Sequence, residues 1–159
     1  MQAPAHRYSA GIATHDISTT IDSLTRDVSL HSPVLASYRF RGADDVAAVL
    51  TAAAEVVSDP EVVADFGTSD RRLVNVRATV DGRPIEITHL LRLDDADRVS
   101  EIRVYVRPLP GLAALLAGLG PRLAGRHSRM RAVFARVSMR PIAFLAPLYD
   151  RVATRLVTR

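Results

Sequence analysis

Three consecutive runs of alternating apolar and polar residues, between residues 73 and 107, constrain the fold of this chain more than any other feature. A period of two residues is typical of strands that bury one face. The runs cover residues 73–80, 84–93 and 99–107, and Asp81-Gly82 between the first two supplies the left-handed residues that a tight hairpin needs. The sequence therefore predicts an antiparallel meander of three long strands.

Helical patterns come before this meander. Residues 3–25 carry apolar residues at helical spacing and predict a helix that breaks near His15, with Asp16 capping its second half. Residues 43–57 carry a second apolar stripe, which ends before Pro60, and short extended segments cover residues 27–33 and 37–40. Residues 61–68 have no clear pattern. Helices followed by a meander predict the α+β class rather than a doubly wound parallel sheet.

The composition changes after residue 110. Residues 111–119 are small and apolar, Gly120-Pro121 is predicted to interrupt them, and two amphipathic helices are expected beyond it. Residues 121–159 hold nine of the 21 arginines and one acid, whereas residues 1–120 hold 12 arginines and 16 acids. We expect a domain at residues 1–110 and a helical extension at residues 111–159, which packs on the domain or across a dimer, or lies on a membrane surface. The extension has few stacking groups and no DNA-binding motif, which argues against a nucleic-acid partner.

Several functional classes are disfavoured by composition. The 159 residues suit one domain, and no window approaches the roughly 18 apolar residues of a membrane span, so a cytoplasmic location is expected. The absence of cysteine excludes disulfides and thiolate metal sites, and the exclusive use of arginine indicates GC-rich codons and an actinobacterial source. No phosphate-binding loop is present, and no cofactor is expected. The histidines are too dispersed to predict a metal site: His6, His15, His31, His89 and His127.

The order and spacing of these segments resemble a known family. The segments DVSLHSPV at residues 27–34, YRFRGADDVAAVL at 38–50 and VDGRPIEITHLLRLDD at 80–95 look like the SnoaL-like branch of the nuclear transport factor 2-like superfamily. The resemblance covers residues 1 to about 110. It implies a cone: a strongly bent, mostly antiparallel sheet wrapped round the N-terminal helices. It also implies an apolar pocket for a small hydrophobic molecule and a homodimer formed through the outer face of the sheet.

Ketosteroid isomerase is the relative whose pocket is easiest to compare. Tyr8 matches its oxyanion tyrosine, Ser32-Pro33 matches the Asp-Pro pair that carries its general base, and His89 matches its second oxyanion donor. A serine hydroxyl does not take a proton at neutral pH without a base beside it. The resemblance therefore implies a pocket of this kind without the steroid isomerase mechanism.

His89 is the most informative single residue, because it interrupts the apolar face of a strand with a group that titrates near neutrality. We expect burial to keep it neutral, so that it acts as a base or donates a hydrogen bond, with Tyr8 and Ser32 converging on the same ligand. Ile87, Leu91 and Val104 would form the apolar walls. The alternative is a core histidine whose ring is satisfied by a backbone carbonyl.

Other polar residues have two interpretations each. Asp16 caps a helix or lies at the pocket, and Asp65 reaches the pocket rim or lies solvated on a strand. His31 is expected at the surface or an interface, and Arg103, Tyr105 and Arg107 form a polar stripe expected there or at the dimer contact, with anion binding as the alternative.

Three functions are compatible with these patterns. The first is a cofactor-free isomerase, cyclase or hydrolase that acts on a hydrophobic substrate through His89 and Tyr8. The second is a non-catalytic binder of an apolar ligand, and the third is a dimeric scaffold that uses its basic tail on a membrane or a protein partner.

Overall fold

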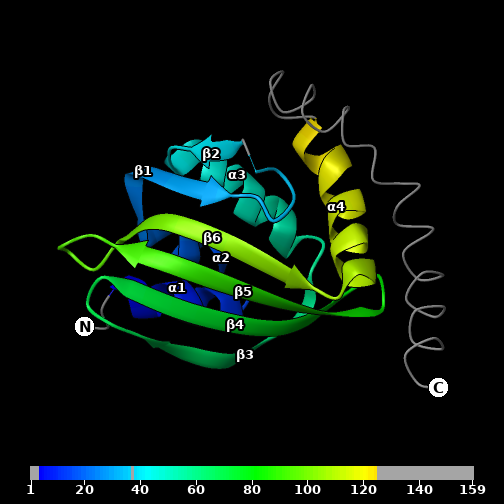
Figure 1. The fold of residues 1–159 in the computed structure, drawn as a ribbon, viewed down its shortest axis with the longest axis horizontal. Coiled ribbons are helices and arrows are strands. Elements are labelled where there is room, and N and C mark those ends of the chain that lie inside the picture. The colour runs from blue at the N-terminus through cyan, green and yellow to red at the C-terminus, as the bar shows by residue number, and fades with distance from the viewer. Residues whose placement is uncertain (1–3, 37, 125–159) are drawn as a thin grey trace.

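The computed structural model describes residues 4–36 and 38–124, and it shows a six-stranded sheet with helices against one face (Figure 1). The predicted α+β class is confirmed. In chain order the elements are α1 (Pro4–Ala13), α2 (Ile17–Asp22), β1 (Leu24–His31), β2 (Arg39–Arg41), α3 (Ala43–Ala54), β3 (Ser58–Gly67), β4 (Arg71–Val80), β5 (Arg83–Leu93), β6 (Val99–Arg107) and α4 (Leu109–Ala124).

The sheet has the strand order β2-β1-β6-β5-β4-β3. The pairs β3–β4, β4–β5 and β5–β6 are antiparallel, as is β1–β2, whereas β1 lies parallel to β6. Asp81 and Gly82, with φ of 51° and 70°, form the turn between β4 and β5. The predicted meander is therefore confirmed, and its hairpin uses left-handed residues as the sequence indicated.

Strand β3 is the element that the sequence pattern missed. It runs from Ser58 to Gly67, so it covers most of the segment at residues 61–68 and begins earlier. The register shifts between Ser58 and Glu61 and again between Val62 and Ala64, so alternation is lost along the strand. Pro60 is tolerated because β3 lies at the edge of the sheet, where one side of the strand needs no ladder partner.

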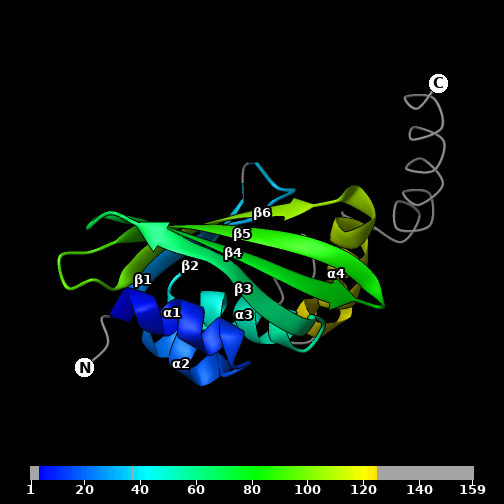
Figure 2. The ribbon, with the colours of Figure 1, turned by 90° about the horizontal axis from the view of Figure 1, so that it is seen from below.

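Figure 2 shows the sheet curving over α1, α2 and α3, with α4 across one end. The inward residues of β1, β4, β5 and β6 form the core with the apolar stripe of α3, and Val28, Val46, Val74 and Ile102 are completely buried. This bent, mostly antiparallel sheet round N-terminal helices is the cone that the resemblance implied.

Helix α4 joins this core. It continues through Pro121 to Ala124, so the predicted interruption at Gly120-Pro121 is wrong. Leu115, Leu119 and Leu123 belong to the buried cluster, and this packing stabilises the helix against the local cost of proline. No helix in residues 4–36 and 38–124 is long and apolar enough to cross a bilayer. The amphipathic helices and membrane contact predicted further along lie outside the described residues.

Candidate functional site

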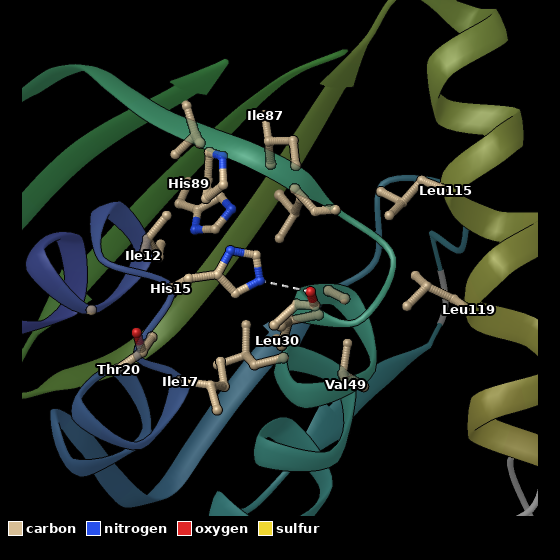
Figure 3. A pocket seen from close by; sticks show the side chains of 18 residues that line it. Ile12, His15, Ile17, Thr20, Leu30, Val49, Ile87, His89, Leu115 and Leu119 are labelled. Atoms are coloured by element: carbon tan, nitrogen blue, oxygen red, sulfur yellow. Dashed lines mark hydrogen bonds between the residues drawn. The ribbon is translucent and has the colours of Figure 1, made fainter. Parts of the chain in front are cut away.

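An apolar cavity of about 140 Å³ lies between the sheet and the helices (Figure 3). Among the described residues that line it, the polar side chains are those of His15, Thr20 and His89. The expected wall residues Ile87 and Val104 are included. The full lining consists of Gly11, Ile12, His15, Ile17, Thr20, Leu30, Val49, Leu50, Ala53, Ala54, Val57, Pro60, Val76, Ile87, His89, Val104, Leu115 and Leu119.

His89 lies in the middle of β5 and points into this cavity (Figure 3). Strand alternation places it on the inner face, and it is paired with Val74 of β4 on one side and Val104 of β6 on the other. Only 8% of the residue is exposed. Burial among apolar side chains lowers its pKa from 6.5 to about 4, so the imidazole is neutral at physiological pH.

Tyr8 of α1 supports His89 from behind the cavity wall. Tyr8 is completely buried, and its hydroxyl lies 2.8 Å from Nδ1 of His89. The two rings meet edge to face, with their centroids 5.6 Å apart. Burial raises the pKa of the Tyr8 phenol, so the hydroxyl keeps its proton. The expected meeting of Tyr8 and His89 is present, but Tyr8 is not part of the cavity lining.

The hydroxyl proton of Tyr8 determines the tautomer of His89. No other partner of this hydroxyl, or of Nε2 of His89, is found among the described residues. If the Tyr8 hydroxyl donates to Nδ1 of His89, that hydroxyl has an acceptor, and only the N–H at Nε2 of His89 is left without a partner. The reverse arrangement leaves a buried O–H without an acceptor, at a cost of about 1–3 kcal/mol. We therefore assign the proton of the neutral ring to Nε2, which is left to donate into the cavity.

His15 is the functional candidate that sequence reasoning undervalued. It lies at the corner between α1 and α2, where its φ of 58° is left-handed, and it lines the cavity. Its Nε2 is 2.8 Å from the carbonyl oxygen of Ala54, the last residue of α3. Figure 3 shows the imidazole rings of His15 and His89 facing one another. The helix break was the sequence signal that could have located this residue.

Ser32 does not reach the cavity. It follows the end of β1, and its Oγ accepts a hydrogen bond from the backbone N–H of Val34 at 3.3 Å. Leu30, two residues earlier, is the residue of this segment that lines the cavity. The expected convergence of Ser32 with His89 is therefore wrong, because β1 ends at His31 and Ser32 lies in the loop that follows it.

Asp16 caps α2 and does not line the cavity. Its side chain accepts hydrogen bonds from the hydroxyls of Ser18 and Thr19 and from the backbone N–H of Thr19. These bonds, that from Ser18 first, lower its pKa to about 2. The capping role expected for Asp16 is confirmed, and its assignment to the pocket is corrected.

Asp65 holds α1 against the edge of the sheet instead of reaching the pocket. Its carboxylate accepts hydrogen bonds from the Ser9 hydroxyl and from Arg72 Nε, both at 2.5 Å. Burial alone would raise its pKa, but these two donors lower the pKa below its usual value. Leu91 is likewise outside the cavity lining; it is buried in the core with 1% exposure.

The outer face of the sheet carries the expected polar stripe. Arg103, Tyr105 and Arg107 are exposed there, and His31 Nε2 lies 3.2 Å from Glu101 Oε1. Desolvation lowers the pKa of His31, although the Glu101 carboxylate opposes the change. A dimer contact on this face stays a prediction. Within the described residues, no three histidine or acidic side chains come together as a metal site.

Comparison with known proteins relates this fold to solved structures. No family model and no curated protein match the chain. A steroid delta-isomerase from Pseudomonas aeruginosa is 28% identical with a TM-score of 0.68, over 79% of this chain and 95% of that one. At this identity and coverage, the likeness extends over nearly the whole of that enzyme.

More distant structures share the same fold. A conserved bacterial protein with a cystatin-like fold from Silicibacter pomeroyi is 23% identical with a TM-score of 0.71, over 79% of this chain and 89% of that one. A candidate SnoaL-like polyketide cyclase from Shewanella denitrificans is 18% identical with a TM-score of 0.52, over 65% of this chain and 88% of that one. Several neighbours are thus small-molecule enzymes by name.

Proposed function

We propose that this chain, which shares the fold of nuclear transport factor 2-like and SnoaL-like proteins, is a small-molecule enzyme of the isomerase or cyclase type. Its substrate is an apolar compound with a carbonyl group. One observation carries this proposal: a neutral imidazole, with one nitrogen occupied by Tyr8, offers its other nitrogen to an apolar cavity. No cofactor is needed for this role.

The chemistry follows from the surroundings of His89. A donor held in a site that excludes water stabilises the negative charge that develops on a carbonyl oxygen during enolisation, and one such donor contributes about 100- to 1,000-fold in rate. The apolar walls select the rest of the ligand, since a second charged or polar group would be desolvated without a partner. Tyr8 is a positioning residue, because it sets the tautomer and the ring orientation without lining the cavity.

Binding of cyclohex-3-en-1-one, a small apolar ketone, tests the donor role of His89. We expect the infrared band of the bound carbonyl to shift to lower frequency in the wild-type protein. His89→Leu should abolish this shift and weaken binding about 10-fold, since a hydrogen bond contributes about 1 kcal/mol or slightly more. His6→Leu is the matched control, because His6 contacts Arg72 outside the cavity. Equal affinity and an unshifted carbonyl band in wild type and His89→Leu would contradict the proposal.

A non-catalytic binder is the second candidate. The observation in its favour is the small number of polar side chains, namely His15, Thr20 and His89, among the described residues of the lining. A binder would show the carbonyl shift without accelerating any change in the ketone, whereas an enzyme shows both.

A further inference from the structure

A small hollow on the outer face of the sheet gathers three arginines from three neighbouring strands. Its volume is about 50 Å³, and its lining consists of Arg71, Leu90, Leu91, Arg92, Glu101 and Arg103. Strand alternation points the three arginine side chains away from the face that carries His89. Figure 2 shows the helices beneath that inner face, so the hollow is separate from the apolar cavity.

The strand register places two of these arginines side by side. Arg71 of β4 is paired directly with Arg92 of β5, and Arg103 of β6 is paired with Leu90, two residues before Arg92. Like charges directly opposite one another destabilise a sheet. Because adjacent strands lie about 4.8 Å apart, the long side chains from all three strands reach the same hollow. An anion bound between the guanidinium groups would offset their repulsion.

Glu101 is the only acid among the described residues that line the hollow, and its carboxylate is already shared. Its Oε1 accepts a hydrogen bond from Nε of Arg103 at 2.6 Å and lies 3.2 Å from Nε2 of His31. The hydrogen bond from Arg103 holds the pKa of Glu101 below its usual value, so the carboxylate is ionised at neutral pH. The side chain of Arg92 has no ion pair among the described residues. Three arginines and one glutamate thus leave two positive charges without a counter-charge.

Acids on the adjacent turns do not neutralise the hollow, and none of those described lines it. Asp70 accepts a hydrogen bond from the Thr68 hydroxyl, and its contact with Nε of Arg71 is 3.7 Å long between side chains that are 68% and 64% exposed. Such exposed ion pairs contribute little. Asp94 is held within its own turn by the backbone N–H and the guanidinium of Arg98. The positive charge of the hollow is therefore available to a ligand.

We propose that this hollow binds the phosphate group of a phosphate monoester between the guanidinium groups of Arg71, Arg92 and Arg103. At neutral pH this group carries about −1.5 to −2 charges and offers three acceptor oxygens, which matches the uncompensated charge of the hollow. A guanidinium binds phosphate through two parallel N–H donors. One water-sized group needs about 10–15 Å³, so the hollow has room for a phosphate. A carboxylate has a single charge and two oxygens, and it would leave one positive charge uncompensated.

Calorimetric titration of the full-length protein with glycerol phosphate tests this site. The probe has no apolar group that the cavity would bind, and we expect saturable binding of one molecule per chain. Arg92→Gln and Arg71→Gln should each raise Kd about 10-fold or more, because each removes a charged hydrogen-bond donor. Both side chains are exposed, so the variants should keep the wild-type midpoint of urea denaturation.

Arg77→Gln is the matched control. Arg77 is exposed on the same face of the same strand and loses the same charge, but it does not line the hollow. It lies about 20 Å from Arg71 along β4, beyond the Debye length of about 8 Å at physiological ionic strength. Its Kd for glycerol phosphate should therefore change less than about twofold.

Vesicles distinguish a soluble phosphate monoester from a lipid headgroup. Phosphatidylcholine vesicles that contain phosphatidate are compared with vesicles of equal surface charge that contain phosphatidylglycerol, whose phosphate is a diester. A preference for phosphatidate that Arg92→Gln abolishes identifies a lipid ligand, whereas binding of glycerol phosphate alone identifies a soluble one. The arginine-rich segment at residues 121–159 is common to both proteins, so its own attraction to vesicles cancels in the comparison.

Three results would overturn the proposal. Absence of saturable binding to both glycerol phosphate and phosphatidate would show that the hollow takes no phosphate monoester. Equal weakening in Arg77→Gln, Arg71→Gln and Arg92→Gln would show that the general charge of the face, and not the hollow, attracts the anion. Acetate that binds as tightly as glycerol phosphate would contradict selection of a doubly charged group.

Discussion

Acid should destabilise this protein through His89 before its carboxylates are protonated. Burial lowers the pKa of His89 from 6.5 to about 4. Between these two pH values the His89 ring binds a proton in the unfolded chain but not in the folded chain. This contribution to stability is fully present above pH 6.5 and is lost as the pH falls toward 4. The loss in free energy of unfolding amounts to about 2 kcal/mol when the pH falls from 7 to 5, and to about 3 kcal/mol when it falls from 7 to 4.

Replacing His89 by leucine should remove this pH dependence. The variant leaves the Tyr8 hydroxyl buried without a partner, which costs about 1–3 kcal/mol at pH 7. The free energy of unfolding, measured by urea denaturation at pH 7, 6, 5 and 4, should nevertheless fall less steeply for His89→Leu than for the wild type. The double variant Tyr8→Phe/His89→Leu removes both partners and should recover stability at pH 7 while keeping the shallow pH dependence.

The difference between variant and wild type isolates His89 from other titrating groups. His31 also has a lowered pKa, and its contribution is common to both proteins. The carboxylates with lowered pKa begin to lose their contribution only as the pH falls below about 5, again in both proteins. Those carboxylates are Asp16, Asp65, Asp70, Asp94 and Glu101. Parallel losses of stability in wild type and His89→Leu between pH 7 and pH 5 would refute a buried, neutral His89.

Three further substitutions test the geometry of the site. Tyr8→Phe should lower the free energy of unfolding by about 1–2 kcal/mol, and ¹⁵N NMR should show a mixture of His89 tautomers. A single unchanged tautomer would show that Tyr8 does not determine the tautomer of His89. Gly11→Ala, at the α1–α2 corner, should lower the free energy of unfolding by about 1–3 kcal/mol in urea denaturation. The added Cβ would collide with Thr20 and lie 2.7 Å from the backbone oxygen of Asp16. Wild-type stability would contradict that close contact. Val104→Phe should fill the cavity and abolish the rise in Tm that the ketone produces, and an undiminished rise would place the ligand elsewhere.

Local pattern was sufficient to predict much of the fold. Alternation along residues 73–107 determines which side chains of the meander face inward, so the pattern was enough to assign Ile87 and His89 to one surface. The Asp81-Gly82 turn and the Asp16 cap could also be predicted from the sequence, because each depends on residues that lie close together in the chain. Resemblance to a superfamily added the bend of the sheet, which alternation does not encode.

Tertiary contacts decided the rest. Strand β3 has little alternating pattern of its own and forms because its backbone pairs with β4. Helix α4 continues through Pro121 because its leucines are buried in the core.

The candidate site depends on such contacts even more strongly. Tyr8 and His89 are 81 residues apart, and His15 and Ala54 are 39 apart, so no local rule could assign a proton to either ring. Strand alternation was enough to place a histidine on the inner face of the sheet. Only the packing of α1 and α3 against that sheet decided what the ring nitrogens would meet, because hydrogen bonds between distant segments exist only once the chain has folded.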